Sequence, residues 1–98
     1  MHTLAQLQSW YADHCNGEWE HVHGVTVESL DNPGWRVRID LRGTPLELRP
    51  FVPIRRPEPD PEWIVCEVQD GRFEAAGGPY MLEEILQRFL GWAGAPQG

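Results

Sequence analysis

Apolar positions near the N-terminus recur with the period of a helix. Residues at steps of three and four fall on one face, namely Leu4, Leu7, Trp10, Tyr11 and His14. Thr3 and Gln6 have the spacing of a capping box, and Asn16-Gly17 has residue types that often end a helix in a left-handed conformation. The pattern therefore predicts a helix over residues 3–15.

From Trp19 the period changes to two, which is typical of strands. Val25 and Val27 alternate with polar neighbours, and the strong turn sequence Asp31-Asn32-Pro33-Gly34 follows them. The next run has one apolar and one charged face. Its apolar residues are Trp35, Val37, Ile39 and Leu41, and its charged residues are Arg36, Arg38, Asp40 and Arg42. The two runs predict an antiparallel hairpin.

A shorter third strand is predicted at Leu46 and Leu48, which alternate with charged neighbours. Pro50 and Pro53 limit this strand, because proline cannot donate a hydrogen bond to a neighbouring strand. Residues 53–61 contain four prolines and are expected to form a stiff surface loop.

The remainder of the chain predicts a second hairpin and a helix. Residues 62–69 and 72–76 read as the fourth and fifth strands, and Asp70-Gly71 between them is a two-residue hairpin signal. A helix is predicted over residues 79–93, with proline at its first position. Its apolar stripe consists of Leu82, Ile85, Leu86, Phe89 and Trp92. Residues 94–98 are expected to form a frayed tail.

These elements predict an α+β fold in the order α-β-β-β-β-β-α. An antiparallel sheet of about five strands over residues 20–76 would be flanked by an N-terminal and a C-terminal helix. The length fits one domain, residues 1–98. Five tryptophans are many for 98 residues, so most of them must pack in the core or against a partner.

The charge balance narrows the range of partners. The chain has 8 basic residues, all arginines, and 15 acidic residues, which gives a formal net charge of −7. Nucleic-acid binding requires cations that neutralise phosphates, and the anionic inner membrane surface attracts cations as well. The sequence therefore predicts neither partner. A basic protein would be attracted, although net charge also serves solubility alone.

A cytoplasmic location is expected. The N-terminus has no signal-peptide pattern, and no apolar run reaches the length of a membrane span. Two cysteines are too few for a disulfide framework, so free thiols are expected.

Candidate metal and cofactor sites receive little support. Metal-ligand residue types crowd into ten positions, namely His14, Cys15, Glu18, Glu20, His21 and His23. Their spacing matches no zinc pattern, so the sequence predicts a polar loop. Gly77-Gly78-Pro79 lacks the lysine and the longer glycine pattern of a phosphate-binding loop. We expect neither a metal nor a cofactor.

Neither cysteine suits a catalytic nucleophile. Cys66 alternates with Ile64 and Val68, which predicts a buried thiol. Cys15 follows a predicted helix C-terminus beside acidic residues, where a thiolate is disfavoured. We therefore expect no catalytic residue and no enzyme.

The tripeptide Glu18-Trp19-Glu20 places an aromatic side chain between two acids. One interpretation is structural, with Trp19 pinning the first helix onto the sheet. The other is an interface anchor with an acidic rim, because tryptophan is enriched at binding hot spots. The sequence leaves both interpretations open.

Several segments in order resemble the immunity protein 53 family of bacterial polymorphic toxin systems. These segments are Trp10-Tyr11, Cys15 to His21, Leu30 to Trp35, Asp40 to Thr44, Glu74 to Pro79 and the leucine-rich helix that ends at Trp92. The resemblance covers about residues 4 to 93 and implies an antitoxin. Such a protein would bind a cognate toxin in the cytoplasm of the producing cell, and an acidic surface would suit a basic toxin.

The resemblance also suggests residues for the contact. Carried over by motif, the candidates are Glu18, Trp19, Glu20, Asp31, Asn32 and Trp35. Each has a structural alternative: Trp35 begins a core face, and Asp31-Asn32 make a turn. Two other functions stay open, namely a small thiol enzyme of the sulfurtransferase type that some relatives are labelled with, and a structural module that oligomerises through a sheet edge.

Overall fold

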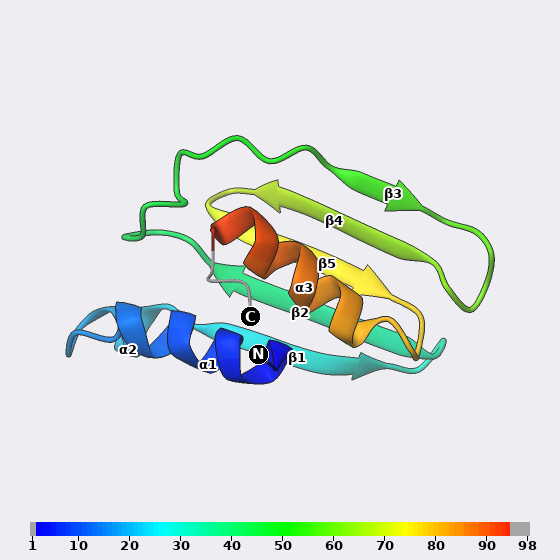
Figure 1. Ribbon diagram of the computed structural model, residues 1–98, viewed down its shortest axis with the longest axis horizontal. Helices are drawn as coiled ribbons and strands as arrows, with labels where there is room; N and C mark the ends of the chain where they lie inside the picture. The colour runs from blue at the N-terminus through cyan, green and yellow to red at the C-terminus, as the bar shows by residue number, and fades with distance from the viewer. Residues whose placement is uncertain (1, 95–98) are drawn as a thin grey trace.

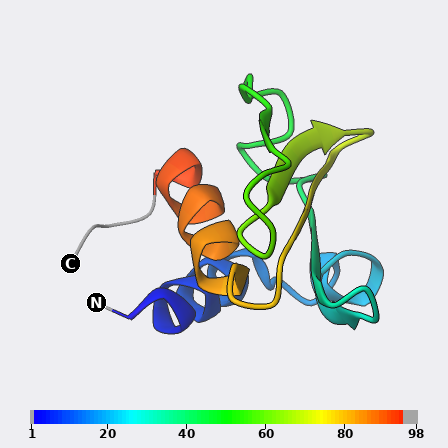
Figure 2. The ribbon, with the colours of Figure 1, turned by 90° about the vertical axis from the view of Figure 1, so that its right-hand side faces the viewer.

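Two long helices lie on one face of a five-stranded antiparallel sheet (Figures 1 and 2). The structure is a computed structural model, and it describes residues 2–94. The helices are α1 (Thr3–His14), α2 (Trp19–Val22) and α3 (Leu82–Ala93), and the strands are β1 (Val25–Leu30), β2 (Gly34–Asp40), β3 (Ile54–Arg56), β4 (Ile64–Gln69) and β5 (Arg72–Gly77). The predicted α+β class and the order α-β-β-β-β-β-α are confirmed, with α2 as an additional single turn.

The strands lie in the order β1-β2-β5-β4-β3 across the sheet. After β2 the chain passes around the end of the sheet in residues 41–53 and returns as β3 on the opposite edge (Figure 1). Strand β5 then fits between β2 and β4, and it pairs with both. As a result β1 and β3 are the two edges of the sheet, and in the part of the chain that the structure describes each of them has a neighbour on one side only.

The core lies between the sheet and the helices. Residues that alternate along β2, β4 and β5 point toward the helices and are buried, namely Val37, Ile39, Ile64, Cys66, Phe73 and Ala75. The Trp10 ring of α1 meets the Phe89 ring of α3 edge-on at 5.0 Å, and Phe89 lies 5.1 Å from Phe73 of β5. These aromatic contacts fasten α1 to α3 and α3 to the middle of the sheet.

The predicted third strand at Leu46 and Leu48 is wrong. Residues 42–48 form turns, in which the Thr44 hydroxyl donates to the Leu41 carbonyl at 2.7 Å and accepts the Leu46 N–H at 3.1 Å. Such local bonds compete with strand pairing. Leu46 is consequently buried, whereas Leu48 is 94% exposed.

The third strand is instead β3, inside the segment predicted as a proline-rich loop over residues 53–61. Ile54, Arg55 and Arg56 stand between Pro53 and Pro57, and they pair with Cys66, Val65 and Ile64 of β4. An edge strand needs hydrogen bonds on one side only, so flanking prolines are compatible with it.

The starts of the sheet and of the last helix also differ from the prediction. The sheet begins at Val25 and not at residue 20, because residues 19–22 form α2. Helix α3 begins at Leu82 and not at Pro79, because the Met81 N–H first closes a turn onto the Gly78 carbonyl. Helix α1 begins at Thr3 as predicted, but its N-cap has no side-chain hydrogen bond.

The predicted hairpin at Asp70-Gly71 is confirmed. Asp70 has φ 55° and Gly71 has φ 75°, which is the pair of positive values that a two-residue hairpin of this kind requires. The last four residues of the predicted tail, 95–98, lie outside the described residues.

The close approach of two loops at Gly78 gives a stability prediction. A Cβ at this position would overlap the backbone carbonyl oxygen of Pro61, and a backbone atom cannot move away easily. We expect Gly78→Ala to lower the free energy of unfolding by about 2 kcal/mol or more, measured by urea denaturation. Gly91→Ala is the matched control, because nothing lies near a Cβ there. It should raise stability by about 0.5–1 kcal/mol through helix propensity, and equal effects of the two changes would contradict the packing argument.

Candidate partner-binding surface

The residues proposed for partner contact lie at the two ends of β1. Glu18, Trp19 and Glu20 belong to α2 and the residue before it, and α2 leads directly into β1. Asp31 and Asn32 lie in the turn that follows β1, and Trp35 lies near the start of β2. The two groups therefore flank one edge strand of the sheet, and they do not form a single cluster.

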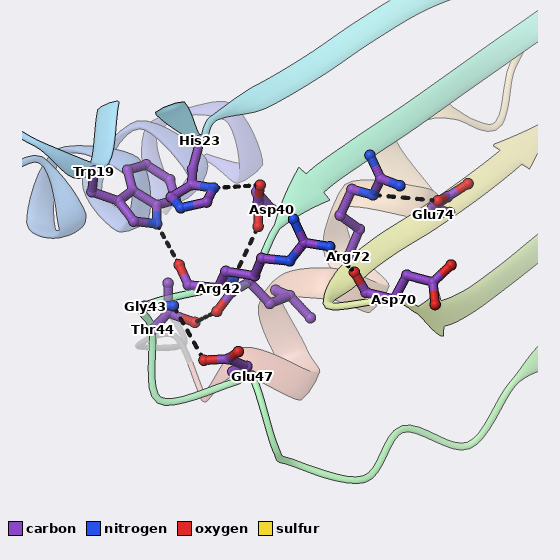
Figure 3. A network of polar contacts seen from close by, with 11 residues as sticks. Trp19, His23, Asp40, Arg42, Gly43, Thr44, Glu47, Asp70, Arg72 and Glu74 are labelled. Atoms are coloured by element: carbon purple, nitrogen blue, oxygen red, sulfur yellow. Dashed lines mark hydrogen bonds and ion pairs between the residues drawn. The ribbon is translucent and has the colours of Figure 1, made fainter. Parts of the chain in front are cut away.

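Trp19 is a packing residue in this structure. Its side chain is 6% exposed, and its indole N–H donates to the Arg42 carbonyl at 2.8 Å (Figure 3). Its ring meets the Trp10 ring edge-on at 6.0 Å. The indole thus holds α2 against α1 and the end of β2, and little of it is available to a partner.

Glu20 is also engaged locally, through a pair of reciprocal caps. The Asn16 side-chain oxygen accepts the N–H groups of Glu18 and Trp19, each at 2.9 Å. The Glu20 carboxylate in return accepts the N–H groups of Asn16 at 2.9 Å and Gly17 at 2.8 Å. Hydrogen bonds from its own backbone N–H and from those of Asn16 and Gly17 lower the pKa of Glu20.

Glu18 differs from Glu20 in that its carboxylate is exposed. No hydrogen bond or ion pair of this carboxylate occurs within residues 2–94. The charge of Glu18 is therefore not neutralised by another side chain of the described residues.

A polar network fixes the start of β1 to the ends of other strands (Figure 3). His23 Nδ1 lies 2.6 Å from Asp40 Oδ2, and Asp40 Oδ1 accepts the Arg42 N–H at 3.0 Å. The Arg42 guanidinium then donates to the Asp70 carbonyl in the β4–β5 turn at 2.9 Å. Through these contacts, the junction of α2 and β1 is tied to the end of β2 and to the β4–β5 turn.

Trp35 likewise joins two parts of the fold. Its indole N–H donates to the Pro79 carbonyl at 2.9 Å, which holds the segment before α3 against β2. Its side chain is half-buried, whereas Asp31 and Asn32 in the preceding turn are exposed. Of the six candidates, Glu18, Asp31 and Asn32 are the exposed ones.

The negative charge of the protein is concentrated on α1, α2, β1 and the turn after β1. Residues 1–35 contain five acidic residues and no arginine or lysine, whereas the other 63 residues contain ten acidic and eight basic ones. The five are Asp13, Glu18, Glu20, Glu28 and Asp31. We call residues 2–33 the acidic side, and its elements run along one long side of the molecule (Figure 1).

Elsewhere, three of the arginines are paired with carboxylates. Arg72 lies 3.7 Å from Glu74, and Glu84 lies within 4 Å of both Arg56 and Arg88. On the acidic side one pair of this kind occurs, between Glu28 and Arg36 of the neighbouring strand at 3.5 Å. Most of the excess of negative charge therefore belongs to the acidic side, where five acidic residues stand without an arginine or lysine, and less of it to the other 63 residues, where ten acidic residues face eight arginines.

The thiols and the metal-ligand residue types form no site within the described residues. No three His, Cys, Asp or Glu side chains of residues 2–94 come together in a way that could hold a metal ion. The Cys15 thiol donates to the Tyr11 carbonyl at 3.3 Å. Cys66 is fully buried, and burial raises the pKa of its thiol to about 11. None of the helices within residues 2–94 has the length and apolar character needed to cross a membrane.

Comparison with known proteins gives one match. The family model described as immunity protein 53 matches residues 4–94, which is nearly the whole chain. No curated protein and no solved structure matches.

The caps around α2 give a prediction about pH. Because the pKa of Glu20 is lowered from 4.5 in the folded protein, its contribution to stability is fully present above that value. The contribution is lost as the pH falls through the lower folded pKa. We expect Glu20→Gln to reduce the melting temperature at pH 7, and the gap from wild type should narrow below pH 4.5. Glu18→Gln makes the same charge change and should leave the melting temperature unaltered; equal losses in both variants would show that the caps have no such role.

The two cysteines should differ sharply in reactivity. A pKa of about 11 for Cys66 leaves roughly one thiol in a thousand ionised at pH 8, and burial also excludes the reagent. We expect Ellman's reagent to modify one thiol of the native protein, and none of the native Cys15→Ala variant. Cys66 should become reactive only in denaturant. Rapid modification of Cys66 in the native Cys15→Ala variant would contradict the structure.

Proposed function

Because this chain belongs to the immunity protein 53 family, we propose that it is an antitoxin for a bacterial polymorphic toxin. In this proposal it binds its cognate toxin in the cytoplasm of the producing cell and occludes the toxin's working surface. It has no catalytic activity and uses neither a cofactor nor a metal.

The distribution of charge is the main observation that supports binding of a basic toxin through the acidic side. Five acidic residues without one arginine or lysine stand in residues 1–35, and this segment includes the edge strand β1. A surface of this kind attracts a basic protein and raises the rate of encounter. Toxins that act on nucleic acids need basic surfaces to hold phosphates, so a toxin of that class would fit the acidic side.

The structure favours Glu18 over its neighbours as a contact residue. Its carboxylate is exposed on the acidic side, whereas Trp19 is buried and Glu20 caps a turn. Asp31 and Asn32 would contribute to the contact at the far end of β1. Trp35 and Trp19 would support this surface from beneath.

The alternative of a thiol enzyme receives less support from the surroundings of the sulfurs. A sulfurtransferase needs an accessible, activated thiolate. Cys66 is buried with a raised pKa, and the Cys15 thiol donates to a carbonyl oxygen.

The proposal is tested with the toxin encoded beside this gene. We expect co-expression of this chain to restore growth of cells that produce the toxin, and titration calorimetry to give tight one-to-one binding. Glu18→Arg should weaken the affinity at least about tenfold at low ionic strength, because it places a cation on the acidic side. The difference between this variant and wild type should shrink as salt is added.

Asp60→Arg is the matched control for Glu18→Arg. It makes the same change in net charge, but Asp60 is an exposed residue in the loop between β3 and β4 at the other edge of the sheet. Its affinity should stay close to that of wild type. Absence of both binding and rescue by the wild-type chain would refute the antitoxin function, and equal effects of the two variants would refute the acidic side as the contact.

A further inference from the structure

Among residues 2–94, strand β1 presents unpaired backbone groups along a free edge. The Asp40 N–H donates to the Gly24 carbonyl at 3.0 Å, and β1 runs antiparallel to β2 from that point with Val25 opposite Ile39. In an antiparallel pair, alternate residues bond to the partner strand and the others point away from it. Thr26, Glu28 and Leu30 therefore bond to β2, and the N–H and C=O groups of Val25, Val27 and Ser29 point outward.

The two edges of the sheet differ in how well they are protected against pairing with a further strand. Strand β3 has three residues, and Pro53 and Pro57 flank it, so it offers little to a further strand. Strand β1 has six residues and contains neither proline nor a basic residue. Short length, proline and lysine are the usual protection of an exposed edge, and β1 lacks all three.

A groove lies beside the start of the free edge, on the helix side of the sheet. This hollow of about 440 Å³ lies between α1 and β1, and it is lined by Leu7, Gln8, Tyr11, His23, Gly24 and Val25. Val27, which also faces the helices, is 42% exposed. Side chains of a strand alternate between the two faces. A strand added to β1 would thus direct every second side chain toward this groove and Val27.

We propose that an extended segment of the toxin adds to β1 as a sixth strand. This inference rests on the proposed function, and it specifies the contact. The outward groups of Val25, Val27 and Ser29 bond to the toxin backbone, and an apolar toxin side chain enters the groove. Basic residues of the same segment lie beside Glu18, Glu28 and Asp31.

The charge distribution favours this occupant over a second copy of the chain. Pairing β1 with β1 of another copy would bring two acidic sides together, each with five acidic residues and no arginine or lysine in residues 1–35. Like charges placed so close oppose association. A basic toxin segment meets no such barrier.

Amide hydrogen exchange of the complex tests the proposal directly. In the free chain, the amides of Thr26, Glu28 and Leu30 are bonded to β2 and should exchange slowly, whereas those of Val25, Val27 and Ser29 should exchange fast. In the complex with the toxin, exchange at the three outward amides should slow at least about tenfold. Unchanged fast exchange at these amides in a saturated complex would overturn the proposal.

A pair of substitutions at Ser29 gives an independent test. Ser29→Pro removes an outward N–H without removing a bond to β2, and edge strands tolerate proline in such positions. Ser29→Ala keeps the N–H and serves as the control. We expect the proline variant to bind the toxin at least about tenfold more weakly than the alanine variant. Both variants should retain the wild-type circular dichroism spectrum. If the proline variant does not fold, the hydrogen-exchange experiment still tests the proposal, because it uses the wild-type chain.

The outcomes separate this proposal from the proposed function. If the wild-type chain binds the toxin and both Ser29 variants bind equally well, the toxin is neutralised through another surface, and the edge proposal alone is wrong. If the wild-type chain binds no toxin, both proposals fall. Light scattering that shows a dimer of the free chain, which Ser29→Pro dissociates, would assign the edge to a second copy and overturn the proposal.

Discussion

The fold depends on tryptophan side chains that fasten irregular segments to helices and strands. Three indole N–H groups donate to backbone carbonyls far away in sequence: Trp19 to Arg42, Trp35 to Pro79 and Trp92 to Pro50. Residues 41–53 and 78–81 belong to no strand or helix, so no regular hydrogen-bond pattern holds them. Each indole buries apolar area and satisfies a carbonyl at the same point. A domain of this size has a modest core, and these contacts extend the core into its loops.

In the short segment from Glu18 to His23, these contacts show which side chains stabilise the fold and which are exposed. Trp19 points inward to Arg42, and His23 is held by Asp40 at the junction of α2 and β1. Glu18, one residue before Trp19, keeps a free carboxylate on the outside. The start of β1 is thus tied to the end of β2, while its outer edge has no neighbouring strand within residues 2–94. A strand that is already held in place lowers the entropic cost of adding another strand to it.

Local patterns made much of the fold predictable. The strict alternation in residues 35–41 identified β2, and Asp70-Gly71 identified the hairpin between β4 and β5. Both signals depend only on residues that are adjacent in the sequence. The alternation at Leu46 and Leu48 led to a wrong strand prediction, because it does not reveal the local turn that the Thr44 hydroxyl closes. For the candidate site, the residue types indicated that Glu18-Trp19-Glu20 is an acidic and aromatic segment, but they did not indicate which of the three side chains is buried. The spacing of Asn16 and Glu20 was a signal that the sequence analysis missed. At four residues' distance the Glu20 carboxylate can reach the Asn16 N–H, and this local hydrogen bond engages Glu20 within its own turn.

The prolines that hid β3 in the sequence also explain why the sheet has one usable edge. Between Pro53 and Pro57 only three residues remain to pair with β4, so the segment resembled a loop, and for the same reason it offers little to another strand. The opposite edge has no such block, and an unprotected edge promotes aggregation unless something else prevents it. Under the proposal of an added toxin strand, the negative charge around β1 takes that role, because repulsion between two acidic sides opposes the pairing of two copies. The same charge would attract a basic chain, so one feature would both oppose self-pairing and select the proposed partner.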